Sequence, residues 1–145
     1  MTPTATVSPT RNTNLALVFQ ELFTAVARLR AGRQAVSDAA SFRHQFKEGL
    51  RLAEANARQF GHSSENTKLA IFALVAFLDE SILNLRSPVF AEWPGKPLQE
   101  ELFGVHIAGE IFFQNVERLL QQQDSPALGD ILEVYLLALQ LGFQG

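Results

Sequence analysis

The sequence predicts an all-α fold in a single domain. Apolar residues recur at spacings of three and four along most of the chain after residue 14, which is the pattern of helices with one buried face. No stretch shows the alternation of a strand, and no glycine-rich phosphate loop occurs. A chain of 145 residues can remove roughly 68–70% of its unfolded surface from water, so one substantial core is expected.

Two amphipathic helices are predicted to follow a disordered lead-in at residues 1–14, which is rich in Thr and Pro. The first helix stops at Gly32, and the second begins near Ser37 or Asp38 and stops at Gly61. The helical domain is therefore expected to span residues 15–145. The apolar stripes are Leu15, Val18, Leu22, Val26 and Leu29 in the first helix, and Phe42, Phe46, Leu50, Ala53, Ala57 and Phe60 in the second.

A third helix is predicted to run from the capping residues Ser63 and Ser64 to about Leu85. Its middle is apolar on every side, so we expect it to be buried on every side. Two adjacent carboxylates, Asp79 and Glu80, follow this apolar run, and no cation lies three or four residues from either one. Because an unpaired carboxylate on an apolar face is costly, a tertiary contact, a ligand or a partner protein must satisfy the pair.

The rest of the chain is predicted to form a loop, a short turn and two more helices. In the loop at residues 86–97, we expect Val89, Phe90 and Trp93 to pack down, with Trp93 as the anchor. The turn at 97–104 leads to a helix over about 105–122, and a cap before Pro126 starts a last helix that runs to about 141. The residues expected to be buried by the 105–122 helix are Ile107, Ala108, Ile111, Phe112, Val116 and Leu119.

Composition excludes several classes of site. The chain has no cysteine, which removes disulfides, thiolate metal sites and Cys nucleophiles. No segment reaches the roughly 18 to 20 apolar residues that a bilayer-spanning helix needs. Residues 61–145 carry eleven Asp/Glu against four Lys/Arg. This acidic half either complements the basic first half inside one fold or offers a docking surface to a basic partner, and both alternatives disfavour nucleic acid.

Two polar arrangements suggest catalysis, a third is a pair of adjacent carboxylates, and each has a simple structural interpretation. His106 and Glu110 stand four apart on one predicted helix face, as in a metal site, but the two Glu-x-x-His motifs of a di-metal bundle are missing. Ser81 lies beside the two carboxylates, yet consecutive helix positions point about a hundred degrees apart. Glu100 and Glu101 are most simply solvated carboxylates in a first helical turn. We therefore predict no catalytic residue, no metal, no cofactor and no small-molecule substrate.

Several motifs in the second half of the chain resemble those of one known family. They are FLDE at 77–80, Trp93, PLQEELFG at 97–104, GEIFFQNVERLL at 109–120 and LEVYLLALQLGFQG at 132–145. In this order and spacing they resemble the DotU/IcmH family of bacterial secretion proteins. The resemblance implies a cytoplasmic, hook-like domain of about six to seven helices in two small packed bundles. The residues to which it gives a structural role are Trp93, Pro97, Leu98, Phe103, Gly104, Gly142 and Phe143.

The same resemblance implies a location and partners. Family members are held at the cytoplasmic face of the bacterial inner membrane by a C-terminal transmembrane helix, so we expect the natural chain to continue past Gly145. The implied partners are a TssM-like inner-membrane protein and a TssK-like baseplate protein, with a homodimer of the full-length protein as a further alternative. Type IVB secretion relatives share these motifs, so the choice between type VI and type IVB systems stays open.

We predict a non-enzymatic scaffold of a type VI secretion system that links the membrane complex to the baseplate by protein contacts alone. Its partner-binding surface is predicted to be an acidic cleft. In the structural alternative, Asp79 caps a neighbouring helix N-terminus through backbone N–H groups. The two interpretations are compatible if Asp79 is structural and Glu80 is exposed. The rivals from other classes are a metal-dependent helical enzyme that uses His106, Glu110 and Asp79, and a helical adaptor unrelated to secretion. The residues predicted to form the acidic cleft are Asp79, Glu80, Glu100 and Glu101.

Overall fold

The computed structural model describes residues 13–145, and every regular element in that range is helical, as predicted. The lead-in predicted at residues 1–14 lies outside the described residues except for Thr13 and Asn14. The Asn14 side chain caps the first helix by accepting a hydrogen bond from Leu17 N at 2.8 Å. The elements are α1 (Leu15–Val18), α2 (Gln20–Arg30), α3 (Ala39–Gln59), α4 (Ser64–Leu85), the 3-10 turns η3 (Pro88–Phe90) and η4 (Trp93–Gly95), α5 (Leu98–Phe103), α6 (Ala108–Leu120) and α7 (Pro126–Gln140).

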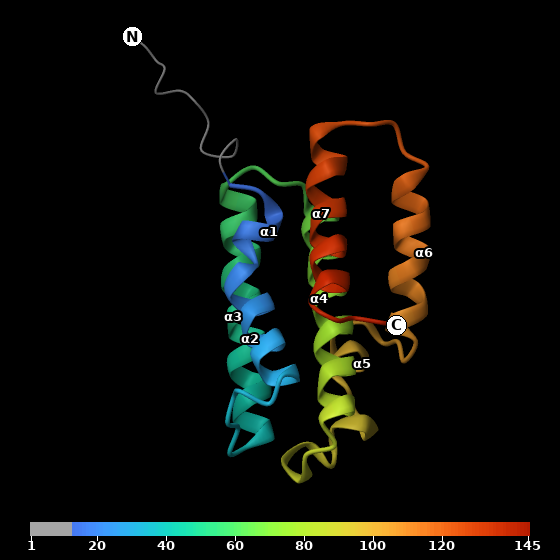
Figure 1. Cartoon of the computed structure of the whole chain (residues 1–145). Coiled ribbons are helices and arrows are strands. Elements are labelled where there is room, and N and C mark those ends of the chain that lie inside the picture. Colours follow the sequence, from blue (N-terminus) through green and yellow to red (C-terminus); the bar gives the residue numbers. More distant parts are fainter. Residues whose placement is uncertain (1–12) are drawn as a thin grey trace.

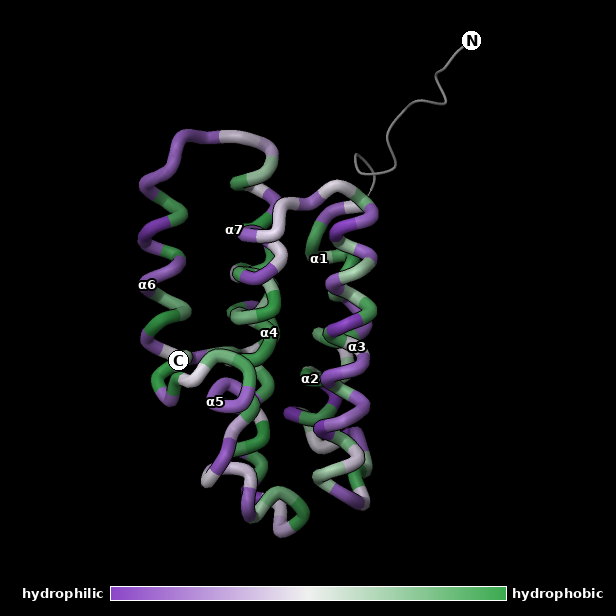
Figure 2. The backbone as a smooth tube through the Cα atoms, turned by 180° about the vertical axis from the view of Figure 1, so that it is seen from behind, coloured by the Kyte–Doolittle hydropathy of each residue, from purple (hydrophilic) through white to green (hydrophobic). Residues whose placement is uncertain are grey.

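The α4 helix is the centre of the molecule and packs against α2, α3, α5, α6 and α7. Figure 1 shows α1, α2 and α3 on one side of α4 and α6 on the other, with α7 in front. The residues from Ala70 to Leu78 are buried except for Phe72, which is half-buried, and Figure 2 shows this hydrophobic run between α3 and α6. The prediction of a helix buried on every side is confirmed. The helices α1 to α3 form one group and the helices α5 to α7 form a second group, and the two groups share α4.

The first predicted helix is divided at Phe19, whose backbone angles (φ −98°, ψ 9°) separate α1 from α2. This break changes the buried stripe: Phe19 and Phe23 are buried, whereas the predicted Val18 and Leu22 are only half-buried. Two phenylalanines remove more apolar surface from water than the aliphatic pair would, which favours this arrangement. The second helix, α3, begins after Asp38 as predicted, because the Asp38 carboxylate accepts a hydrogen bond from Ser41 N at 3.1 Å.

The segment between α4 and α6 differs from the prediction in two places. Phe90 and Trp93 are buried as expected, but Val89 is 37% exposed because it lies on the outer side of the η3 turn. The α6 helix begins at Ala108 rather than near residue 105. Gly104 ends α5 with a left-handed backbone (φ +68°), and the chain stays non-helical up to Ile107 (φ −121°, ψ 41°), the N-cap of α6. Ile107 therefore precedes α6 and is 53% exposed instead of buried.

An aromatic cluster joins α2, α4 and α6 to the segment after α7. The ring of Phe77 on α4 stacks on Phe23 with centroids 6.2 Å apart, and meets Phe143 edge-on at 6.5 Å. Phe143 in turn lies 4.4 Å from Phe112 on α6. All four rings are buried, so this cluster holds the two groups of helices together. Within residues 13–145, no helix combines the length and the apolar character needed to cross a bilayer.

We expect Phe77→Ala to lower the free energy of unfolding by about 3–5 kcal/mol, because it removes a fully buried ring from this cluster. A urea titration followed by circular dichroism measures the loss. Leu83→Ala is the control, since Leu83 lies on the same helix but is 48% exposed, and we expect a change within about 0.5 kcal/mol. Equal losses for the two variants would contradict the central position of Phe77.

Candidate functional site

Asp79 is 1% exposed, and its carboxylate caps the start of α5 from the neighbouring α4. Oδ1 accepts hydrogen bonds from Trp93 Nε1 at 2.8 Å and from Leu98 N at 3.0 Å. Oδ2 accepts from Gln99 N at 2.9 Å and from Gln99 Nε2 at 3.0 Å. A carboxylate this buried cannot line an open acidic cleft, so the structural alternative describes Asp79. The sequence did not show this cap because its donors lie 14 to 20 residues away.

Gln99 carries this network from α5 to α6. Its amide nitrogen donates to Asp79, and its Oε1 accepts a hydrogen bond from the backbone N–H of Ala108, the first residue of α6, at 2.9 Å. The N-cap residues of the two helices, Pro97 and Ile107, make no side-chain cap. One buried carboxylate and one buried amide therefore satisfy N–H groups at two helix starts that would otherwise lack an acceptor.

Arg43 of α3 covers the other side of Trp93. Its guanidinium carbon lies 4.0 Å from the centre of the indole ring, a cation–π contact. The same side chain donates to Lys96 O at 2.5 Å and pairs with Glu101 at 3.0 Å. Lys47 also pairs with Glu101, and the hydrogen bond from Lys47, with a further one from Arg43, holds the pKa of Glu101 below its usual value. Glu101 thus joins α5 to α3.

Glu80 meets a cation from a distant part of the chain. Its Oε2 lies 3.1 Å from a guanidinium nitrogen of Arg30 on α2, and its carboxylate accepts from Gln144 N at 3.0 Å and Gly145 N at 2.8 Å. Arg30 also donates to Gly142 O at 2.7 Å. The Glu80 side chain is only 17% exposed, so it is less exposed than the combined interpretation, with a structural Asp79 and an exposed Glu80, expected. Gly142 has φ +121°, and a Cβ there would meet Arg30 Nε at 2.8 Å, so this position favours glycine.

The histidine–glutamate pair on one helix face is not observed. His106 precedes α6 because that helix starts later than predicted, and its Nε2 lies 3.2 Å from Glu100 Oε1 rather than beside Glu110. Since Asp79 is bonded to Trp93, Leu98 and Gln99, the structure does not assemble the triad that the rival enzymatic hypothesis would need. Within residues 13–145, no group of three or more His, Asp or Glu residues is arranged to hold a metal ion.

The four predicted cleft carboxylates do not share one surface. Asp79, Glu100 and Glu101 belong to the region around the start of α5, whereas Glu80 faces α2 and residues 142–145. Every one of them has a partner inside the molecule, and contact with another protein stays a prediction. The other motif residues lie within the fold: Trp93, Pro97, Leu98 and Phe143 are buried, Phe103 is half-buried against Phe72, and Gly104 and Gly142 have positive φ angles.

A family model and two solved structures match most of this chain. A family model described as "Type VI secretion system protein DotU" matches residues 14–145. The crystal structure of SciP/TssL from the type VI secretion system of enteroaggregative Escherichia coli 042 is 29% identical, with a TM-score of 0.76 over 90% of this chain and 74% of that one. The cytoplasmic domain of TssL from Acinetobacter baumannii is also 29% identical, with a TM-score of 0.82 over 91% of this chain and 83% of that one. No curated protein matches the chain significantly.

We expect Asp79→Ala to lower the free energy of unfolding by at least about 3 kcal/mol, because it leaves several buried N–H donors without an acceptor and each costs about 1–3 kcal/mol. Trp93→Phe keeps an aromatic ring and removes one of those donors, so a smaller loss of about 1–3 kcal/mol is expected. Urea unfolding followed by circular dichroism compares both with Glu110→Ala, an exposed control. If the Asp79→Ala variant proved as stable as the Glu110→Ala variant, the capping role of Asp79 would be ruled out.

We also expect the ion pairs of Glu101 to stabilise the protein only above acidic pH. Its pKa in the folded state lies below the usual 4.5, so their stabilisation is present above about pH 4.5 and is lost as the pH falls through the folded pKa. Because the pair is partly exposed, the contribution is about 0.2–1 kcal/mol. Urea unfolding of the wild type and of the Glu101→Gln variant, at about pH 7 and at about pH 3, measures this contribution as the difference between their free energies of unfolding. A stability difference that does not shrink in acid would contradict this assignment.

Proposed function

The chain belongs to the DotU family of type VI secretion proteins, and from this premise we propose that it is a non-enzymatic scaffold connecting the membrane complex of the apparatus to its baseplate. The observation that carries the proposal is the likeness to two TssL structures along nine-tenths of the chain. In this role the protein works at the cytoplasmic face of the inner membrane. Its partners are a TssM-like inner-membrane protein and a TssK-like baseplate protein.

The polar side chains of the candidate site are bound to other groups of the protein itself, which supports a role without catalysis. The buried carboxylate Asp79 accepts four hydrogen bonds from the protein itself, and Glu80 is bound to Arg30 and to backbone N–H groups. A general acid or base has to reach a substrate, and these groups instead hold helices and the last residues in place. His106 pairs with Glu100 at the surface, with 64% of its side chain exposed.

The protein surface also suits assembly by contact. Among residues 13–145, ten large apolar side chains are more than a third exposed, from Leu139 at 36% to Leu120 at 66%. Single exposed apolar residues are ordinary, but those that gather on one face mark sites where proteins associate. A scaffold that acts through protein contacts needs such faces.

Deleting the gene from its own bacterium is expected to abolish type VI secretion, measured as release of the secreted tube protein into the medium, and to prevent assembly of the contractile sheath. The wild-type gene should restore both. Affinity-tagged protein should co-purify with the TssM-like and TssK-like proteins from the same cells. Normal secretion without the gene would contradict the proposal.

A variant separates the scaffold from the enzymatic rival. His106→Ala removes the exposed imidazole that a metal-dependent enzyme would use, and it leaves the buried network intact. We expect this variant to restore secretion as fully as the wild type. Failure to restore secretion, with a normal melting temperature and normal partner binding, would favour chemistry at this side chain.

A further inference from the structure

The hairpin of α6 and α7 carries exposed apolar side chains in a regular pattern. Phe113 and Leu120 on α6 are 40% and 66% exposed, and Leu136 and Leu139 on α7 are 51% and 36% exposed. We call these four residues the hairpin face. Each one directly follows a buried residue in the sequence, and those buried residues are Phe112, Leu119, Tyr135 and Ala138.

Helix geometry puts the four exposed side chains on one side of the hairpin. The two helices run antiparallel (Figure 1), and they meet where Phe112 and Tyr135 lie 4.6 Å apart and Asn115 Nδ2 donates to Tyr135 OH at 3.1 Å. The next residue along an α-helix points about 100° away. In an antiparallel pair, that rotation turns both helices toward the same side, so the residues that follow the buried ones share a surface.

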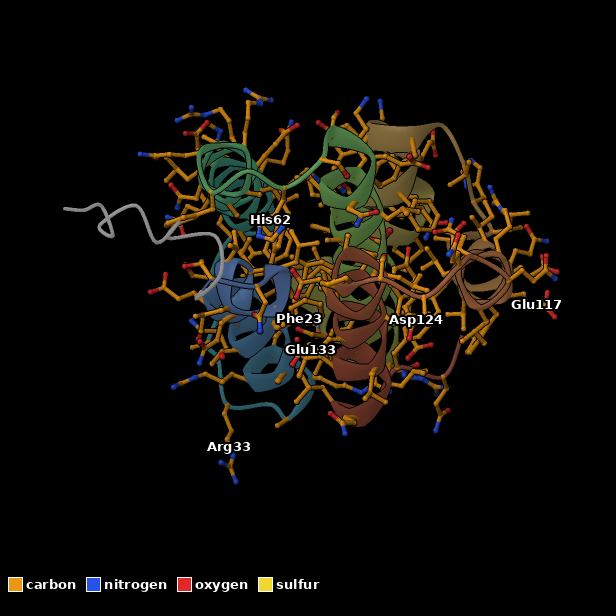
Figure 3. The ribbon with its side chains drawn as sticks, turned by 90° about the horizontal axis from the view of Figure 1, so that it is seen from above. Phe23, Arg33, His62, Glu117, Asp124 and Glu133 are labelled. Carbon is orange, nitrogen blue, oxygen red and sulfur yellow. The ribbon has the colours of Figure 1, made fainter. Side chains whose placement is uncertain are left out.

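Acidic residues border this surface. Glu110 and Glu117 lie three and four residues from Phe113, and Glu133 lies three residues before Leu136, so each is a neighbour of an exposed apolar side chain on its helix. None of the three forms an ion pair with any residue of 13–145. Glu117 points away from the body of the molecule in Figure 3.

The charge balance of the hairpin is one-sided. Residues 108–140 contain five Asp/Glu and a single basic residue, Arg118, whose guanidinium donates to Asn115 Oδ1 at 3.1 Å. A separate apolar groove of about 740 Å³ between α3, α4, α5 and α6 differs, because its rim carries Lys and Arg as well as Glu. Unlike that groove, the hairpin face combines apolar contact area with a border of one charge, which specifies the chemistry of what binds there.

We propose that the hairpin face binds an amphipathic helix of a partner protein whose apolar side is flanked by Lys or Arg residues. The apolar side chains of that helix cover Phe113, Leu120, Leu136 and Leu139, and its basic residues pair with Glu110, Glu117 and Glu133. The inference rests on the proposed scaffold function and names the chemistry of one partner segment.

A designed peptide tests the proposal directly. The probe is a fluorescein-labelled helical peptide of about 18 residues built from Leu and Lys, with Leu at i, i+3, i+4 and i+7. A peptide with Glu in place of every Lys is its control. Fluorescence anisotropy at low salt should show binding of the Leu/Lys peptide that weakens at higher ionic strength. Equal binding of the Leu/Glu peptide, or no binding of the Leu/Lys peptide, would overturn the proposal.

Matched variants locate the binding surface. Glu117→Lys with Glu133→Lys should weaken the Leu/Lys peptide at least about tenfold, whereas Glu21→Lys with Glu65→Lys changes the net charge equally on other helices and should have little effect. Leu120→Ser with Leu136→Ser should also weaken binding, in contrast to Leu17→Ser with Leu52→Ser, which are similarly exposed on α1 and α3. If a pair of substitutions on the hairpin and its control pair weakened peptide binding equally, the attraction would be non-specific, and docking at the hairpin face would be refuted.

Two further measurements separate this inference from the proposed function. If the gene is needed for secretion but the Glu117→Lys and Glu133→Lys variant restores secretion fully, the result supports the scaffold role and contradicts docking at the hairpin face. Sedimentation of the wild type and the Leu120→Ser and Leu136→Ser variant tests a second copy as the occupant. A dimer that only the wild type forms would contradict a partner helix on this face.

Discussion

The carboxylate of Asp79 is the interaction on which the second half of the structure depends. An ion removed from water costs several kcal/mol unless hydrogen bonds replace its hydration. Here Trp93 and the first N–H groups of α5 replace it, and Gln99 extends the network to the start of α6. Because Pro97 and Ile107 offer no side-chain cap, both short connections between α4 and α6 take their geometry from this one buried group.

A second polar contact, at the adjacent residue Glu80, fixes a different side of α4. Arg30 reaches from α2 to Glu80 and to the carbonyl of Gly142, while Glu80 holds the N–H groups of residues 144 and 145. Phe143, between these bonds, enters the aromatic cluster with Phe77. The two adjacent carboxylates of α4 thus act in different directions, one toward α5 and one toward α2 and the last residues of the chain.

The carboxylates of the protein fall into two sets, which differ in whether they form ion pairs within the molecule. The carboxylates near the core are paired within the molecule, whereas Glu110, Glu117 and Glu133 on the outer hairpin form no ion pair with the described residues. The paired charges join helices to one another, and the unpaired ones beside apolar side chains are those that our proposal assigns to a partner helix.

The sequence by itself determined the all-α class, the buried central helix, the caps of α3, α4 and α7 and the anchoring by Trp93, because spacing and capping are local properties of the chain. It did not determine where α6 starts, because the Gln99 side chain of α5 caps that start, or how Asp79 and Glu80 are satisfied. Their partners, Trp93 and Leu98 on one side and Arg30 on the other, lie 14 to 50 residues away in the chain. Only the packing of α2, α4 and α5 brings these groups within hydrogen-bonding distance, so the role of each carboxylate was decided by the tertiary structure.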